Sequence, residues 1–151
     1  MQLIYLGGLG KTLMRLSKEK DRIEKRELIV IDNECDDCKR YGATLIKPEE
    51  AFDFEEGALV AGGCGNVSSA AFKRIITQYG EKLNYFVVLP FKFEGKRRAE
   101  NAKEIVRLLK GRRHYIYDNQ KLVHTLAPGV GMKEGLEMVV IDYDKFLRKI
   151  R

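Results

Sequence analysis

The sequence contains no hydrophobic run long enough to cross a bilayer, and it does not begin with a charged segment followed by an apolar one. We therefore expect neither a transmembrane helix nor a signal peptide, and a cytoplasmic location. Internal repeats, low-complexity tracts and linker-like segments are also missing, which argues against a second domain. With 151 residues, 44% of them hydrophobic, residues 1–151 are expected to form one domain. A domain of this size buries roughly 68–70% of the surface of its unfolded chain.

Soft metal ligands are scarce, with three cysteines and two histidines in the whole chain. Cys35 and Cys38 form a CxxC motif, but a structural zinc site needs four ligands and no second CxxC is present. The other candidates are Cys64, His114 and His124, and lone histidines of this kind are expected to be structural or surface residues. We predict no metal site. The CxxC pair stays open to a zinc, a redox, a free-thiol or a disulfide interpretation.

Charge of both signs is abundant, since 28 Lys and Arg residues face 22 Asp and Glu residues, for a formal net charge of +6. Such a mixed surface favours anionic ligands only weakly. Basic residues toward the C-terminal half could form a nucleic-acid patch, but no aromatic stacking motif accompanies them. We therefore expect a solvated surface, and no nucleic-acid partner, for Lys96, Arg97, Arg98, Arg112, Arg113, Arg148, Lys149 and Arg151.

The most informative segment runs from Ala58 to Ala102. A short apolar run ends in a glycine-rich loop at residues 62–66, and Ser68 and Ser69 open a segment with apolar residues at helical spacing. This pattern predicts a strand, a loop and a helix. Glycines let a backbone approach a phosphate closely, and the first N–H groups of a helix have no intrahelical partners. The segment is thus a candidate phosphate site, with a plain tight turn as the alternative.

A second strand and glycine loop opens the chain, with the apolar run Gln2–Leu6 followed by GGLGKT. A Rossmann dinucleotide site would need a third glycine where Leu13 stands, although Asp32 lies roughly 20 residues on, where a ribose-binding acid belongs. A P-loop would put Lys11 beneath a phosphate, but the glycine that its spacing requires falls on Tyr5.

GGLGKT also resembles the deviant Walker loop of the MinD/ParA ATPases, in which Lys11 would contact phosphate, although Leu6 occupies the position of that family's signature lysine. A different resemblance covers more of the chain. PFKFEGKRRAENA (residues 90–102) is similar to the segment after the fifth strand of the FtsZ/tubulin GTPases, and GGCGNVSSAA (residues 62–71) aligns with their GGGTGTG signature and two following alanines. GGLG matches the first glycine loop of that family, and DNQKL (residues 118–122) resembles its base-contacting loop.

The FtsZ/tubulin resemblance implies an α/β fold: a three-layer, Rossmann-like sandwich with six mostly parallel strands and helices on both faces. It places the ligand at the carboxyl ends of the strands. A carboxylate near the base would accept hydrogen bonds from N1 and N2 of guanine. Including Lys11 from the ATPase interpretation, the implied roles are phosphate binding by Gly7, Gly8, Gly10, Lys11, Gly63, Gly65, Asn66 and Ser68, ribose contact by Asp32 or Glu34, and base recognition by Asn119 and Asp142.

The implied ligand is GTP or GDP, with Mg²⁺ possible, and the implied partner is a full-length FtsZ-like cell-division protein. The family's acidic catalytic loop and second domain have no counterpart in residues 1–151, and Lys39–Gly57 has no room for the loop that contacts the γ-phosphate. We therefore expect guanine-nucleotide binding without autonomous GTPase activity, no catalytic residues, and a role as regulator or cap of an FtsZ-like polymer. The alternatives are a MinD/ParA-like ATPase and an FtsZ-like interaction module without nucleotide.

Overall fold

The computed structural model describes residues 1–120 and 132–151, apart from the side chains of residues 132 and 133. His124 and the last two residues of the DNQKL motif therefore lie outside the described residues. The strands are β1 (Gln2–Leu6), β2 (Glu27–Ile31), β3 (Ala43–Ile46), β4 (Leu59–Gly62), β5 (Asn84–Leu89) and β6 (Arg113–Asp118). The α-helices are α1 (Gly7–Leu16), α2 (Cys38–Tyr41), α3 (Asn66–Tyr79), α4 (Lys96–Leu108) and α6 (Met132–Ile150), and short 3₁₀ helices cover Glu19–Arg22, Gly80–Lys82 and Lys92–Glu94.

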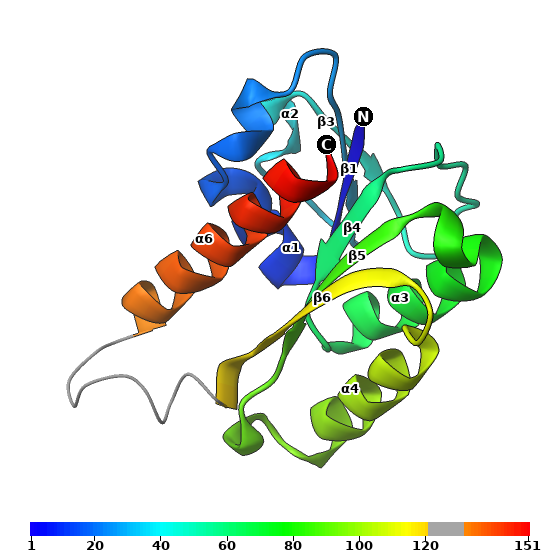
Figure 1. Ribbon diagram of the computed structural model, residues 1–151, viewed down its shortest axis with the longest axis vertical. Coiled ribbons are helices and arrows are strands. Elements are labelled where there is room, and N and C mark those ends of the chain that lie inside the picture. Colours follow the sequence, from blue (N-terminus) through cyan, green and yellow to red (C-terminus); the bar gives the residue numbers. More distant parts are fainter. Residues whose placement is uncertain (121–131) are drawn as a thin grey trace.

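The six strands form one sheet in the order β3-β2-β1-β4-β5-β6 (Figure 1). Every pairing in it is parallel, so the predicted mostly parallel sheet is confirmed and is parallel throughout the described residues. The chain builds outward from β1 in one direction through β2 and β3, and in the other through β4, β5 and β6. The strand order thus reverses between β1 and β4, and ligands of such sheets bind in the crevice beyond the strand ends at that point.

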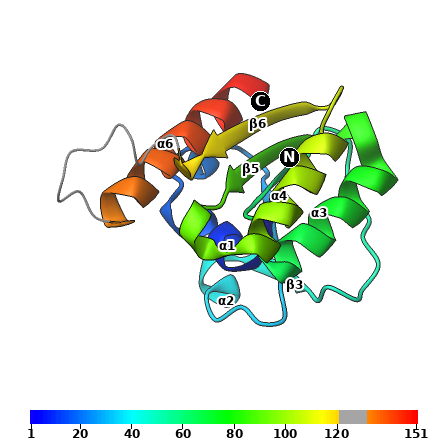
Figure 2. The same ribbon diagram turned by 90° about the horizontal axis from the view of Figure 1, so that it is seen from below.

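Helices cover both faces of the sheet, as predicted (Figure 2). On one face α3 and α4 bury Phe72 and Ile105 against inward residues of the strands, including Ile4. On the other face α1 and α6 bury Leu13 and Tyr143. The central strands are apolar on both sides because both sides are covered, which is why β1 and β4 read as continuous hydrophobic runs.

Two further points concern the segment between β2 and β4 and the character of the helices. Lys39–Gly57 contributes most of α2 and all of β3. Residues 48–50 after β3 form a turn, in which the Glu50 carboxylate accepts the Lys47 N–H and Arg74 binds the carbonyls of Pro48 and Glu50. Within the described residues, none of the helices has both the length and the apolar character that a bilayer crossing needs.

Candidate functional site

The first glycine loop forms the start of α1. The helix begins at Gly7 directly after β1, and no side chain caps its first turn. Gly7 has a φ of 66°, a left-handed value that glycine adopts without strain, so β1 turns into α1 with no intervening loop. Gly8 is exposed, whereas Gly10 is buried against β1 and β4. The unpaired N–H groups of the first turn therefore lie at the carboxyl edge of the sheet.

The second glycine loop leads from β4 into α3. Gly65 is the N-cap residue of α3, and no side chain caps this helix either. A Cβ added to Gly7 would collide with the Ser68 hydroxyl, and one added to Gly63 would lie 3.1 Å from a methyl of Leu9. The starts of α1 and α3 are therefore in contact. Two uncapped helix N-termini meet at the point where the strand order reverses.

Ser68 has a different role from the predicted one. Its side chain is buried, and the hydroxyl donates a hydrogen bond to the Leu6 carbonyl at 3.0 Å. The single hydroxyl proton is thus committed to the end of β1 and is not available to a phosphate. In this arrangement the Ser68 hydroxyl fixes the start of α3 against β1, and a contact of Ser68 with phosphate stays a prediction. Gly10 likewise serves close helix–strand packing, although its N–H belongs to the first turn of α1.

The segment after β5 brings a positive charge to the second glycine loop. The Arg98 guanidinium lies 3.6 to 3.9 Å from where a Cβ of Gly65 would be. Arg98 also pairs with the Glu94 carboxylate at 3.1 Å, and Asn101 donates to the Cys64 carbonyl at 3.2 Å. From the sequence we expected Arg98 to be only a solvated surface charge, because its position depends on how α4 packs beside α3. Arg98 and Asn101 therefore join the candidate site only through the fold.

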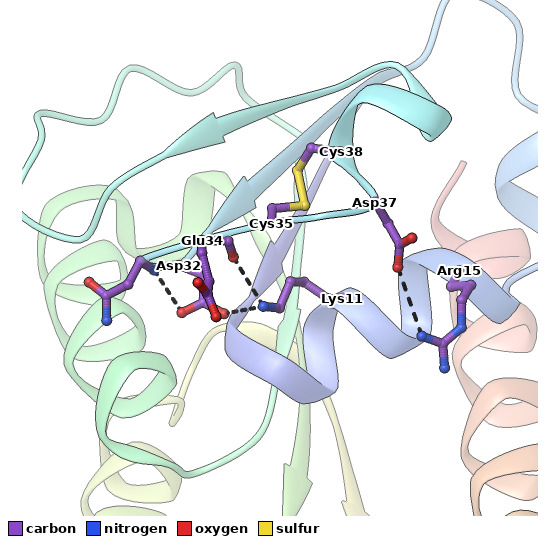
Figure 3. The surroundings of a disulfide bond; sticks show 8 residues. Lys11, Arg15, Asp32, Glu34, Cys35, Asp37 and Cys38 are labelled. Carbon is purple, nitrogen blue, oxygen red and sulfur yellow. Dashed lines mark hydrogen bonds and ion pairs between the residues drawn. A yellow bond between two sulfur atoms is a disulfide. The ribbon is translucent and has the colours of Figure 1, made fainter.

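Lys11 and the acidic residues after β2 form a separate cluster (Figure 3). The Lys11 ammonium lies 2.8 Å from an oxygen of Asp32 and donates to the Glu34 carbonyl at 3.0 Å. The other oxygen of Asp32 accepts the Asn33 N–H at 2.8 Å. Lys11 is thus directed toward the expected ribose side of the site, where it fixes the β2–α2 connection. Asp32 keeps lone pairs that can accept further hydrogen bonds, whereas Lys11 has less freedom to reach a phosphate.

The two residues expected to recognise a base lie apart. Asn119 follows the last residue of β6, at the carboxyl edge. Asp142 lies in the middle of α6, where its carboxylate accepts a hydrogen bond from Tyr115 at 2.7 Å. Tyr115 lies within β6, and the four residue steps from Tyr115 to Asn119 span roughly 13 Å of extended chain. The structure therefore does not bring Asp142 and Asn119 to the same place, and their shared recognition of a base stays a prediction.

The basic residues of the C-terminal half do not form one surface. Arg98 lies at the carboxyl edge, whereas Arg148 and Arg151 pair with the buried Glu19 carboxylate, at 3.6 and 2.8 Å. The latter pairs hold the last turn of α6 against the 3₁₀ helix that follows α1. These arginines serve packing between elements rather than a shared binding face.

The geometry fits a phosphate better than a resident metal. Backbone N–H groups of two helix starts and one guanidinium are donors of the kind that hold phosphoryl oxygens. Within the described residues, no group of three or more His, Cys, Asp or Glu side chains is arranged to hold a metal ion. Mg²⁺ in nucleotide sites is usually held by one or two carboxylates together with the phosphates, so its participation stays a prediction.

Comparison with known proteins supports the fold assignment. No protein-family model and no curated protein matches the sequence. Among solved structures, the chain resembles an empty FtsZ dimer from M. jannaschii with a TM-score of 0.62 and 20% identity, over 97% of this chain and 51% of the FtsZ chain. A point mutant of FtsZ from the same organism gives a TM-score of 0.59 and 18% identity, over 97% of this chain and 53% of that chain.

The chain therefore has an FtsZ/tubulin-like, Rossmann-like fold, and the predicted fold class is confirmed. It spans about half the length of the FtsZ structures that it matches. At this level of identity the likeness concerns the fold alone, and the ligand has to be argued from the site.

Proposed function

We propose that this protein binds a guanine nucleotide at the carboxyl edge of its sheet, with the phosphates over the starts of α1 and α3. The observation that carries the proposal is the contact between two uncapped helix N-termini where the strand order reverses. Each terminus offers unpaired N–H groups and the positive end of a helix dipole. A phosphate chain satisfies both sets of donors at once.

The surroundings of the two helix starts support this assignment. Gly8 and Asn66 are exposed, so a ligand can reach the first turns of α1 and α3. Arg98 lies beside Gly65 and is half exposed, which leaves its guanidinium able to contact a phosphate as well as Glu94. Phosphoryl oxygens bind guanidinium and backbone N–H groups through charge-assisted hydrogen bonds, which are about twice as strong as neutral ones.

The sugar and base are assigned along the same edge. Asp32 and Glu34 follow β2 on one side of the phosphate position and would contact the ribose. Asn119 follows β6 on the other side, and we propose that its amide contacts the base, as its resemblance to the FtsZ base-contacting loop implies. Asp142 is left out of the base site because its carboxylate lies against Tyr115, within β6 and away from the carboxyl edge.

The ATPase alternative has less support from the geometry. A MinD/ParA-like enzyme needs its loop lysine at the phosphates, whereas Lys11 is bound to Asp32 and to the Glu34 carbonyl. An interaction module without nucleotide gives no role to the contact between the starts of α1 and α3, although α2 and α4 also begin without a side-chain cap. The nucleotide proposal accounts for both observations.

The proposal predicts that GDP and GTP stabilise the protein more than ADP, ATP or NAD. A ligand present at about 100 times its dissociation constant stabilises the native state by roughly 2.7 kcal/mol. For a chain of this size that amounts to a rise of roughly 5 to 10 °C in Tm. The measurement is a thermal-shift panel of the five nucleotides with Mg²⁺. Equal stabilisation by ATP and GTP would show that the base is not recognised.

Two variants locate the base. Asn119→Ala should remove the difference between GTP and ATP, because the amide that distinguishes the bases is lost. Asp142→Asn should keep the difference, since Asp142 contacts Tyr115 and lies away from the carboxyl edge. If instead Asp142→Asn removes the preference, the base lies against α6 and the assignment to Asn119 is wrong.

We further propose that this chain binds the nucleotide without hydrolysing it, and that it regulates or caps an FtsZ-like polymer. Glu94 is bound by Arg98 and by the Phe91 N–H, and Asp32 is paired with Lys11 on the side assigned to the ribose, so neither carboxylate is placed as a general base beside the phosphates. We expect binding without appreciable GTP hydrolysis by this chain alone. At the same edge Phe93 is 78% exposed beside Lys92, which suits contact with an FtsZ-like subunit in a regulatory or capping role. Phosphate release by this chain alone measures its own GTP hydrolysis. Phosphate release by a full-length FtsZ with and without this chain measures the regulatory or capping role.

A further inference from the structure

The CxxC motif forms a disulfide between Cys35 and Cys38, whose Cα atoms are 5.5 Å apart. It lies in the connection between β2 and α2, at the same edge of the sheet as the nucleotide site proposed above. Cys38 is buried as the first residue of α2, whereas Cys35 is partly exposed in the loop. A thiolate from solution can therefore approach the Cys35 sulfur, and the buried Cys38 sulfur is the one that leaves.

The disulfide closes a loop that α1 holds on two sides (Figure 3). On one side of the disulfide, Lys11 binds the Asp32 carboxylate at 2.8 Å and the Glu34 carbonyl at 3.0 Å. Within the CxxC turn, Arg15 lies 4.0 Å from the Asp37 carboxylate. Lys11 and Arg15 are one turn apart on α1. The helix whose start is assigned to phosphate thus also contacts the β2–α2 connection, in which Asp32 and Glu34 directly precede the residues that the disulfide closes.

We propose that the Cys35–Cys38 disulfide is an exchange site for a dithiol reductant, and that its redox state sets the affinity of the adjacent nucleotide site. This proposal rests on the proposed function. In the exchange, a thiolate of the dithiol attacks the Cys35 sulfur, and Cys38 leaves as a thiolate and takes up a proton. The second thiol of the dithiol then attacks the mixed disulfide and releases Cys35 as a thiol. The dithiol is oxidised to its disulfide, and both electrons reside on the two cysteines.

The oxidised form is expected to bind more tightly, because the disulfide already restricts the β2–α2 connection. Binding then costs less conformational entropy. With the disulfide closed, residues 35–38 are restricted, which limits the motion of the connection that carries Asp32 and Glu34 beside α1. After reduction the contacts of Lys11 with Asp32 and Glu34 still hold the start of the connection. The CxxC turn itself then keeps only the exposed Arg15–Asp37 pair with α1, and exposed ion pairs of this kind are weak. Binding then has to order the loop, so the affinity falls. By linkage, bound nucleotide makes the disulfide harder to reduce by the same factor.

The test compares the unmutated protein in its oxidised form and after reduction by excess dithiothreitol. Two measurements are made on each form: the dissociation constant for GDP, and amide hydrogen exchange of residues 33–41. We expect reduction to raise the dissociation constant by about fivefold or more, a usual size for coupling between two sites. Exchange of the loop amides should become faster. Cys64 adds little background, because burial raises the pKa of its thiol to about 12.

The variant Cys35→Ser/Cys38→Ala provides the control. It should bind GDP as the reduced protein does, and dithiothreitol should change neither its affinity nor its loop exchange. Equal GDP affinity in the oxidised and reduced forms would overturn the proposal, as would loop exchange that reduction leaves unchanged. If neither form binds GDP, the proposed function fails together with the affinity part of this proposal, whereas faster loop exchange on reduction would still support the exchange site.

Discussion

Replacing Gly65 by valine is expected to raise the dissociation constant for GDP by roughly 10- to 100-fold while leaving the fold intact. The range corresponds to losing one hydrogen bond between a backbone N–H and a charged phosphate, worth about 1.5 to 3 kcal/mol. Gly65 has φ of −68° and ψ of 174°, an extended conformation open to valine. Its Cβ would lie 3.6 Å from the nearest atom of Arg98, an ordinary van der Waals contact. The added methyl groups would occupy space that the phosphate needs.

Isothermal titration with GDP measures the loss, and thermal unfolding without ligand checks the fold. Valine is a poorer N-cap residue than glycine, so a loss of about 1 kcal/mol in unfolding free energy is expected. Ala70→Val is the matched control, because Ala70 is exposed on the same helix beyond its first turn. Its affinity should be unchanged. Normal GDP binding by Gly65→Val would mean that the phosphates do not lie at the start of α3.

The largest expected effect on stability comes from Gly10→Ala, which should cost about 3 kcal/mol of unfolding free energy. An alanine Cβ at this position would lie 2.8 Å from the carbonyl carbon of Tyr5 and 3.2 Å from the carbonyl oxygen of Ala61. Both are backbone atoms of central strands, so they cannot move aside as a side chain could. Overpacking of a core typically costs 1 to 3 kcal/mol, and an immobile backbone puts this site at the upper end of that range.

Gly8→Ala is the matched control for Gly10→Ala, two residues away in the same turn of α1. Nothing lies within 4 Å of a Cβ at Gly8, and alanine forms helix more readily than glycine. We expect Gly8→Ala to be neutral or more stable by up to about 1 kcal/mol. Urea unfolding midpoints of the three proteins give the comparison. Similar midpoints for both variants would mean that α1 is not packed this closely on β1 and β4.

Much of the architecture could be predicted because it depends on local patterns. The apolar runs ending in glycine placed β1 and β4 to within a residue or two, and helical spacing after Ser68 predicted α3. The parallel order of the strands followed from the FtsZ/tubulin resemblance, which the structural comparison confirms.

The site was harder to predict because its details depend on partners far away in sequence. Ser68 looks like a phosphate ligand until the Leu6 carbonyl, 62 residues earlier, is placed beside it. Arg98 reaches Gly65 only because α4 packs against α3. The position of Asp142 depends on how α6 lies along β6, and periodicity in one helix does not reveal the distance to another element.

The state of the two CxxC cysteines could not be predicted from the sequence either. Two cysteines separated by two residues are compatible with a metal ligand pair, free thiols or a disulfide, because the spacing leaves the backbone conformation undetermined. The turn between β2 and α2 brings the two Cα atoms to 5.5 Å, within the usual disulfide range. The turn itself is held by contacts of Asp32 and Glu34 with Lys11, which is far away in sequence.

An NMR titration of the ¹⁵N-labelled protein with GDP tests the central claim most directly, because it reports where the phosphates bind as well as whether they bind. We predict the largest amide shifts at residues 7–11 and 63–68, the first turns of α1 and α3 and the loop between β4 and α3. Smaller shifts should appear at Asp32–Glu34 and at Asn119. The absence of shifts at saturating GDP, or shifts concentrated between β6 and the middle of α6, would contradict the account.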